Sequence, residues 1–235
     1  MMNNYLVITG ASRGIGLATA KRFLENGFQV INLSRNPCPL TEVTHIQVNM
    51  AKTGFEESLK KELPPILENA NRVVLVHNAA RLEKDTVENI EASTLRDILE
   101  INVVAPTVLN RMVIPAMKNS SAIIYLGSTL SEKAVAGAFS YVTSKHAVVG
   151  IMRATCQDLM GTGIHTACVC PGFTDTPMLR THLNDDPVIL EQIKGMTALN
   201  RLVEPAEIAE TVYFAANHPV INGAILHANL GQKES

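Results

Sequence analysis

The chain has 235 residues, of which 46% are hydrophobic and 18% charged, and its formal net charge is −2 at pH 7. This composition supplies enough apolar surface for a buried core, which excludes a disordered chain, and the balanced charge argues against a nucleic-acid-binding protein. The apolar runs are shorter than the roughly 20 residues that span a bilayer and the N-terminus lacks the features of a signal peptide, so we expect a cytoplasmic protein without membrane contacts.

Apolar segments of strand length recur along the chain. They cover residues 5–9, 28–33, 45–48, 72–76, 122–126, 164–169 and 224–227. Several are continuously apolar, which is typical of strands buried on both faces of a parallel sheet. Between them, the periodicity predicts a helix from about Ile15 that Gly27 terminates, helices over 93–117 and 139–160, and a helix after Pro205. Pro106 and Pro115 would kink or interrupt the second of these.

The alternation of strands and helices predicts an α/β fold. We expect one domain over residues 1–235, built as a doubly wound, Rossmann-type parallel sheet of about seven strands with helices on both faces. Residues 174–204 break the alternation, because they are long, polar in the middle and follow the carboxyl end of a strand. Ligands of open α/β sheets bind at that edge, so we expect a substrate loop or mobile lid there, the alternative being a surface insertion without a role.

A glycine-rich turn, T-G-A-S-R-G-I-G, follows the first predicted strand and opens the first helix. Gly10 suits a tight turn, Gly14 lets the backbone approach a pyrophosphate, and Gly16 lets the helix lie close to the sheet. The helix N-terminus supplies N–H groups and the positive end of a dipole for the phosphates. The turn therefore predicts a dinucleotide site. Its predicted contacts are Gly10, Ser12, Arg13, Gly14, Ile15 and Gly16.

The end of the second predicted strand indicates which dinucleotide binds. A carboxylate there would bind the ribose 2′-hydroxyl of NAD, but this chain has Ser34 and Arg35 instead. Arg13 lies in the glycine turn, close to the same region of such a fold. Guanidinium groups make forked, charge-assisted bonds to phosphate, so the two arginines favour NADP, with Ser34 as a further contact. Either arginine alone would also suit a solvated surface position.

Tyr141 and Lys145 are one helical turn apart and share a face of the predicted helix. A phenol is a poor acid or base near neutrality, and a neighbouring ammonium favours its ionised form, so the pair suits proton transfer to a carbonyl oxygen. The spacing alone also arises by chance on exposed helices. Ser128 adds weight because it follows an apolar strand at the edge where active sites gather. Asn102 lies between apolar residues and must find partners if buried.

Together these motifs resemble the short-chain dehydrogenase/reductase family, and in particular 3-oxoacyl-acyl-carrier-protein reductases and carbonyl reductases. The likeness covers nearly the whole chain. It implies that Tyr141 is the general acid/base and that Ser128 holds the substrate oxygen. It further implies that Lys145 binds the nicotinamide ribose beside Tyr141, and that Asn102 holds a relay water.

The resemblance also implies further cofactor contacts. Residues 170–176 are similar to the family's P-G-x-x-x-T segment, which grips the carboxamide, and 201–205 are similar to its R-x-x-E-P stretch. The implied contacts are Asn49, Met50, Asn78, Ala79, Pro171, Gly172, Phe173, Thr174 and Thr176. The chain departs from the family at Ala80, where glycine is usual, and at Asn49 and Asn229, where aspartate is usual. These departures put local cofactor contacts in doubt but leave the four catalytic positions intact.

The leading hypothesis is an NADPH-dependent reductase of a ketone or aldehyde, such as a 3-oxoacyl thioester or a small apolar carbonyl compound. The alternatives are an alcohol dehydrogenase acting in the oxidative direction and a non-catalytic NADP-binding sensor or scaffold. We expect residues 129–139 and 174–204 to line the substrate pocket. Their apolar side chains favour an apolar substrate body and include Val135, Phe139, Met178, Leu179 and Leu183.

Two further expectations concern partners and metals. Segments 93–117 and 139–160 could pair across a two-fold axis in a homodimer or homotetramer, although the chain's own sheet could cover them instead. Cys168 and Cys170 alternate along a predicted strand, so both thiols should lie on one face as small buried hydrophobes. Since no Cys or His pairs stand at ligand spacing, we expect no metal site.

Overall fold

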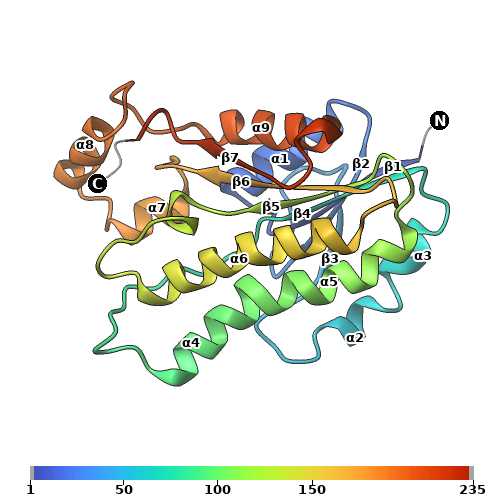
Figure 1. Cartoon of the computed structure of the whole chain (residues 1–235), viewed down its shortest axis with the longest axis horizontal. Coiled ribbons are helices and arrows are strands. Elements are labelled where there is room, and N and C mark those ends of the chain that lie inside the picture. Colours follow the sequence, from blue (N-terminus) through green and yellow to red (C-terminus); the bar gives the residue numbers. More distant parts are fainter. Residues whose placement is uncertain (1–2, 233–235) are drawn as a thin grey trace.

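Within residues 3–232, which the computed structural model describes, seven strands form one parallel sheet in the order β3-β2-β1-β4-β5-β6-β7 (Figure 1). They are β1 (Asn4–Thr9), β2 (Gln29–Ser34), β3 (Thr44–Gln47), β4 (Arg72–His77), β5 (Ala122–Leu126), β6 (His165–Pro171) and β7 (Ala224–Ala228). The predicted fold class is therefore confirmed, and the predicted strand ends shift by only one or two residues. The strand order reverses between β1 and β4, and such switch points create a ligand crevice beyond the carboxyl ends of the strands.

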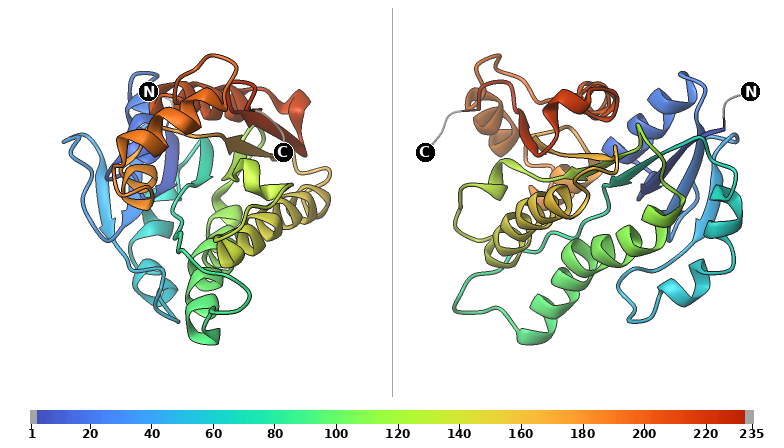
Figure 2. Two further views of the ribbon diagram at one scale, coloured as in Figure 1. Left: turned by 90° about the vertical axis from the view of Figure 1, so that its left-hand side faces the viewer. Right: turned by 45° about the vertical axis from the view of Figure 1, so that its right-hand side comes forward.

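Helices cover both faces of the sheet. They are α1 (Gly14–Leu24), α2 (Glu56–Leu59), α3 (Leu63–Leu67), α4 (Ala92–Leu99), α5 (Ala105–Val113), α6 (Phe139–Asp158), α7 (Pro177–His182), α8 (Pro187–Gly195) and α9 (Pro205–Asn217). Figures 1 and 2 show α1 and α9 on one face and α5 and α6 on the other. Alternate strand residues accordingly enter two apolar clusters. Leu6 packs with Phe23 and Val212 in one, and Val7 packs with Leu109 and Met152 in the other.

The first helix ends at a left-handed glycine, as predicted. Gly27 has φ +76°, its N–H bonds the carbonyl of Leu24, and the N–H of Phe28 bonds the carbonyl of Phe23. This pair of bonds is a Schellman motif with glycine at C′. The turn directs the chain back into β2.

Residues 92–116 form one unbroken helical segment rather than a helix interrupted by proline. A π-helical turn, Glu100–Val104, joins α4 to α5, and a short 3₁₀ turn, Ile114–Ala116, follows. Pro106 has no N–H to donate to the carbonyl of Asn102 four residues earlier, so regular α-helical bonding cannot continue through this turn. The segment is apolar enough to satisfy a membrane-span criterion, with a mean hydropathy of 1.3. Its residues Ile98, Leu109 and Val113 are fully buried, so one side of this segment is part of the core.

Residues 174–204, the expected substrate loop, are not irregular: they contain α7 and α8. Thr176 caps α7, and its hydroxyl oxygen accepts a bond of 3.2 Å from the N–H of Leu179. Arg180 forms a forked ion pair with Asp175 at 2.6 and 2.7 Å. These bonds attach α7 to the end of β6.

Candidate active site

The glycine turn is too tightly packed for side chains at key positions. Gly10 and Gly14 have φ values of +73° and +57°, which glycine adopts without strain. A Cβ on Gly16 would lie 2.2 Å from the carbonyl oxygen of Gly10 and 2.6 Å from Nδ2 of Asn78. Glycine at this position therefore lets the start of α1 rest on the turn. The first N–H groups of this helix have no partner within the helix itself.

The turn is joined to the loop after β4. The hydroxyl oxygen of Thr9 accepts bonds of 2.9 Å from the N–H groups of both Asn78 and Ala79. The amide nitrogen of Asn78 donates to the carbonyls of Thr9 and Gly10, at 2.8 and 3.0 Å. Asn78, predicted as a cofactor contact, thus also holds the two loops of the switch point together.

Asn32 is a residue of this site that sequence reasoning missed. It is fully buried in β2, and its carbonyl oxygen accepts a 2.9 Å bond from the N–H of Ala11 in the glycine turn. An asparagine within an otherwise apolar strand was the signal that could have revealed it. Its amide nitrogen donates to the hydroxyl of Ser34 at 2.9 Å.

Arg13 and Arg35 are exposed at one corner of the crevice. Arg13 immediately precedes α1, and Arg35 follows β2. The N–H of Gly10 bonds the carbonyl of Leu33 at 3.0 Å, so the glycine turn lies beside the end of β2. Neither guanidinium bonds another side chain or carbonyl within the described part of the chain. Both cations are therefore available to an anion. The hydroxyl of Ser34, by contrast, is buried and donates to the carbonyl of Asn36 at 2.5 Å.

Asn49 and Met50, the cofactor contacts predicted after β3, have different surroundings. The side-chain oxygen of Asn49 accepts a 3.1 Å bond from the N–H of Ala51, which shapes the loop at the sheet edge. Met50 is 7% exposed, and its side chain belongs to the apolar cluster under the sheet. A role for Met50 at the crevice would therefore have to come from its backbone.

The catalytic pair predicted on α6 lies close together. The ammonium of Lys145 is buried, donates a 2.7 Å bond to the carbonyl of Leu126 at the end of β5, and lies 5.5 Å from the centroid of the Tyr141 ring. Tyr141 is half-buried. The pair therefore stands at the carboxyl end of the central strands.

Ser128 reaches the same place from β5. It caps the short 3₁₀ helix Thr129–Ser131, and its hydroxyl oxygen accepts a 3.1 Å bond from the N–H of Leu130. This short helix packs against α6. Because the hydroxyl accepts from the backbone, its hydrogen stays available to a ligand in the crevice.

Asn102, in the π-helical turn, is 2% exposed and fully engaged. Its carbonyl oxygen accepts from the N–H of Arg81 at 2.8 Å, and its amide nitrogen donates to the carbonyl of Arg81 and the hydroxyl of Ser144, at 3.0 and 2.9 Å. Ser144 adjoins Lys145, so Asn102 links α6 to the loop after β4. Since both amide hydrogens are used, the relay water predicted at Asn102 would need another of its groups.

Asp85 and Ser140 form a second link that sequence reasoning missed. The buried carboxylate of Asp85 accepts a 2.9 Å bond from the N–H of Ser140 and a short bond from its hydroxyl. Ala138, at the N-cap of α6, offers no side-chain oxygen. Asp85 thus caps α6 from another part of the chain, one residue before Tyr141.

The loop after β6 closes the crevice. Thr174 is 5% exposed, and its hydroxyl donates to the carbonyl of Gly172 at 3.0 Å. Thr176 faces the glycine turn, where its Cγ2 would lie 3.3 Å from a Cβ on Gly14. The carbonyl of Phe173 accepts from Val203 at 2.8 Å, and Pro171 is the last residue of β6. This loop and the glycine turn therefore meet across the switch point.

Several buried groups near the site have pKa values shifted from their ordinary range. Cys168 and Cys170 lie on one face of β6, with sulfur atoms 3.8 Å apart, as predicted. The hydrogen bond between them lowers the pKa of Cys170 to about 7 and raises the pKa of Cys168. Burial lowers the pKa of His77 to about 4. Among residues 3–232, no three His, Cys, Asp or Glu side chains are grouped so that they could hold a metal ion.

The chain is similar to known proteins in both sequence and fold. Residues 4–187 match the family model described as short chain dehydrogenase. A 2-(R)-hydroxypropyl-CoM dehydrogenase of Xanthobacter autotrophicus is 29% identical over 96% of each chain. A 3-oxoacyl-acyl-carrier-protein reductase of Staphylococcus epidermidis is 29% identical over 98% of this chain and 99% of its own. A solved structure of 4-hydroxyisoleucine dehydrogenase with NADH has a TM-score of 0.88 at 23% identity, covering 97% of this chain and 98% of its own.

Proposed function

Because this chain belongs to the short chain dehydrogenase family, whose members are oxidoreductases that use a nicotinamide cofactor, we propose that it is an NADPH-dependent reductase of a ketone or aldehyde. The observation that carries this proposal is the placement of Tyr141, Lys145 and Ser128 together at the carboxyl ends of β5 and β6. Proton donors and a dinucleotide crevice then occupy one edge of the sheet.

The residues at the switch point suit a dinucleotide. A Cβ on Gly16 would collide with the carbonyl of Gly10, so glycine at this position lets the start of α1 rest on the turn. The first N–H groups of a helix have no partner within the helix and suit phosphate groups. The glycine turn with Ser12 and Ile15 would hold the pyrophosphate, and residues 171–176 would hold the nicotinamide end. We assign the 2′-phosphate of NADP to Arg13 and Arg35, since both guanidinium groups are exposed and lack partners among the described residues.

The chain's own groups then account for the proton transfer. A nicotinamide cofactor held by the glycine turn and residues 171–176 would supply the hydride for the carbonyl carbon. The phenol of Tyr141 donates a proton to the carbonyl oxygen, and the hydroxyl of Ser128 holds that oxygen with the hydrogen it leaves free. The ammonium of Lys145 stabilises the phenolate that results and binds the ribose. Asn102 holds α6 in register through Ser144.

The proposal also covers the direction of the reaction and the substrate class. One relative is named for an alcohol oxidation and another for a carbonyl reduction. The chemistry is reversible, so oxidation of an alcohol is the second candidate; an NADP-binding sensor without turnover would require a disabled catalytic pair. NADPH oxidation with a panel of 3-oxoacyl thioesters, diketones, quinones and aromatic aldehydes tests the proposal. Tight NADPH binding without turnover across the panel would favour the sensor instead.

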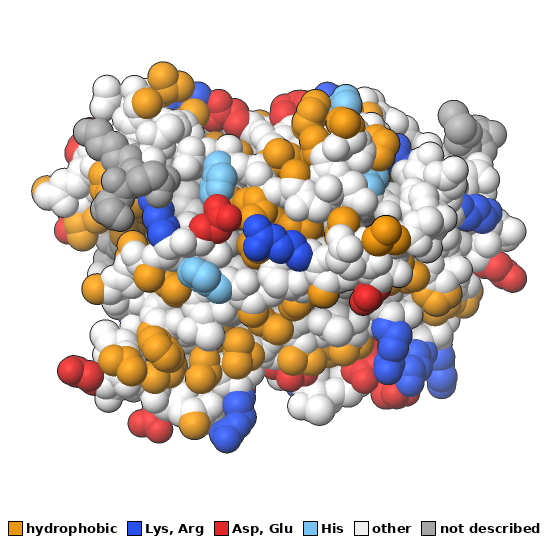
Figure 3. Space-filling view, in the orientation of Figure 1, with side chains coloured by type: hydrophobic (Ala, Val, Ile, Leu, Met, Phe, Trp, Pro, Cys, Tyr) orange, Lys and Arg blue, Asp and Glu red, His pale blue; other side chains and the backbone are white. Residues whose placement is uncertain are grey.

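We also propose a cytoplasmic homodimer or homotetramer that acts on small molecules. Figure 3 shows hydrophobic side chains gathered over α4, α5 and α6. Val104, in the π-helical turn between α4 and α5, is 39% exposed, and Phe139, on α6, is 38% exposed. Met160, beyond α6, is 73% exposed. A second copy packed across a two-fold axis would cover them. Sedimentation analysis tests this, since a monomer at micromolar concentration would contradict it.

A further inference from the structure

A surface cavity of about 340 Å³, open to solvent, lies beside the start of α6. Lys84, Asp85 and Asn89 line it from the loop between β4 and α4, Gly137 lines it from the segment before α6, and His182 from the end of α7. Figure 1 shows these three segments at the same end of the molecule, beyond the carboxyl ends of the strands. The cavity and the proposed substrate crevice therefore lie at the same end of the molecule.

The acidic side chain that lines this cavity, Asp85, already accepts hydrogen bonds from within the protein. The carboxylate of Asp85 accepts two bonds from Ser140. The side-chain oxygen of Asn89 accepts a 2.8 Å bond from the N–H of Thr86. The nearby carboxylate of Glu83 pairs with Arg81 at 2.7 Å. The acceptors at and beside the cavity are thus engaged within the protein.

The donors of the cavity, by contrast, are free. The ammonium of Lys84, the ring of His182, the amide nitrogen of Asn89 and the hydroxyl of Thr86 bond no other group in residues 3–232. Burial and the charge of Lys84 lower the pKa of His182, so the two side chains act on each other across the cavity. A cavity with free donors and engaged acceptors suits an acceptor-rich, anionic group.

The cavity lies beside the start of the helix that carries Tyr141, the proposed proton donor. Gly137 is hydrogen-bonded to Asp85, whose carboxylate caps α6 one residue before Tyr141. His182 ends the helix that Thr176 begins at the cofactor side. A substrate whose carbonyl meets Tyr141 can therefore extend between α7 and the start of α6 toward Lys84.

We propose that the substrate carries an anionic group, such as a carboxylate, at the end away from its carbonyl, and that Lys84 and His182 bind this group. The inference rests on the proposed carbonyl reduction and narrows its substrate class. Charge-assisted hydrogen bonds contribute enough that losing one changes affinity roughly tenfold to hundredfold.

The test compares methyl ketones that end in a carboxylate with their methyl esters. The series 4-oxopentanoate, 6-oxoheptanoate and 8-oxononanoate varies the distance between the two groups. We expect a higher kcat/KM for the acid than for its ester at one chain length at least. Lys84→Met should reduce that ratio roughly tenfold or more. His182→Asn should also lower the ratio of kcat/KM for the acid to kcat/KM for the ester.

Lys61→Met is the matched control, because Lys61 is exposed and lies between α2 and α3. An equal effect of Lys61→Met, or an acid-to-ester ratio that Lys84→Met does not change, would overturn the inference. Calorimetric binding of heptanedioate, which has no carbonyl to reduce, separates the two proposals. If heptanedioate binding depends on Lys84 but no ketone is reduced, the anion site is supported and the proposed reaction is refuted. Reduction of ketones with no Lys84-dependent binding refutes the anion site alone.

Discussion

The ammonium of Lys145 lies 5.5 Å from the centre of the Tyr141 ring and is held there by the carbonyl of Leu126. The cation is thus fixed beside the phenol by the end of a core strand, not by a flexible surface contact. In the proposed mechanism, the ammonium in this position would stabilise the negative charge on Tyr141 after the proton transfer.

Tyr141→Phe is the first prediction. Loss of the general acid should lower kcat/KM by roughly 10²- to 10⁴-fold while the affinity for NADPH is retained. Steady-state kinetics and fluorescence titration measure the two quantities. Tyr213→Phe is the control, because Tyr213 lies on α9 and its ring packs 4.6 Å from the guanidinium of Arg22. Undiminished turnover in Tyr141→Phe would remove the proposed mechanism.

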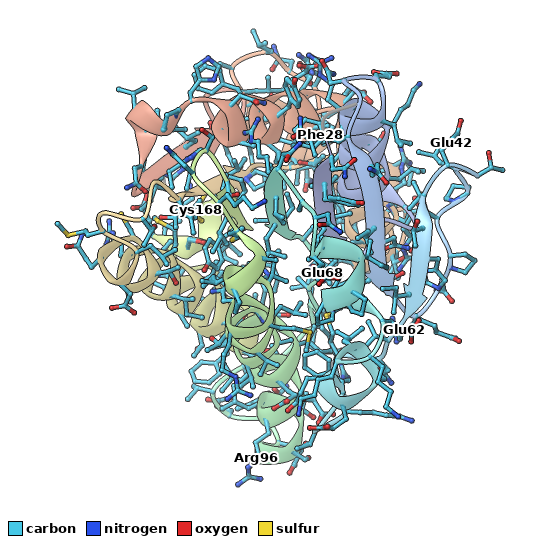
Figure 4. All side chains as sticks on the ribbon, turned by 90° about the vertical axis from the view of Figure 1, so that its right-hand side faces the viewer. Phe28, Glu42, Glu62, Glu68, Arg96 and Cys168 are labelled. Atoms are coloured by element: carbon cyan, nitrogen blue, oxygen red, sulfur yellow. The ribbon has the colours of Figure 1, made fainter. Side chains whose placement is uncertain are left out.

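The second prediction concerns cofactor choice. Arg13→Ala and Arg35→Ala should each lower the preference for NADPH over NADH by roughly tenfold or more, because each removes a charge-assisted bond to the 2′-phosphate. Dissociation constants for both cofactors provide the ratio. Arg96→Ala should leave the ratio unchanged, since Figure 4 shows this residue at the outer end of the helices, away from the sheet. Equal losses for both cofactors would contradict the assignment to a 2′-phosphate.

The third prediction concerns acid stability. His77 is fully buried, and its ring donates a 2.8 Å bond to the side-chain oxygen of Asn110. Its folded-state pKa of about 4 lies below the ordinary value of 6.5, so protons bind the unfolded chain more tightly. Stability from this group is present above pH 6.5 and is lost as the pH falls toward 4. At pH 5 the loss should be roughly 2 kcal/mol.

Denaturant unfolding at pH 7 and pH 5 measures this loss. His77→Gln keeps an amide donor toward Asn110 but does not titrate, so its unfolding free energy should depend less on pH. His165, whose pKa is also lowered by burial, would retain its own contribution of the same sign. If the two proteins show identical pH dependence, His77 is not the titrating group.

The fourth prediction uses the packing of the glycine turn. Gly16→Ala should abolish NADPH binding and lower stability, because its Cβ would collide with the carbonyl of Gly10. Gly195→Ala is the control, since no atom lies within 4 Å of the added Cβ at the end of α8. Its stability should stay within about 0.5 kcal/mol of the parent. Normal NADPH affinity in Gly16→Ala would place the cofactor elsewhere.

The fifth prediction concerns the cap on α6. Asp85→Ala leaves the N–H and hydroxyl of the fully buried Ser140 without an acceptor, which should cost about 1–3 kcal/mol in the free energy of unfolding. Asp85→Asn keeps one carbonyl oxygen for the N–H and should lose less. Chemical denaturation of the two variants measures the difference, and equal losses would show that the cap bond is not the cause.

Much of the site was predictable because the relevant residues are close in the chain. The glycine turn spans Thr9 to Gly16, and a phosphate-binding turn works through its own successive N–H groups. Tyr141 and Lys145 face the same way because a helix repeats every 3.6 residues. The parallel sheet was likewise predictable from continuously apolar strands, since both of its faces are covered.

Other parts of the site could not be predicted from local patterns. Pro106 marked a disturbance in the helix 92–116, but whether a kink, a break or a π-helical turn results depends on what packs against it. Residues 174–204 contained too few periodic apolar positions to indicate α7 and α8. The bonds from Asn78 to the glycine turn join residues 68 and 69 positions apart.

The amino-acid sequence by itself determined the seven strands, the long helices between them, the glycine turn and the spacing of the proposed proton-transfer pair, because these depend on backbone geometry over a few residues. Only the tertiary structure decided that Asn32 holds the glycine turn, that Asp85 caps α6 and that Lys84 and His182 share a cavity. A buried polar group must find a partner, and which partner it meets is settled when the sheet brings distant loops to one edge.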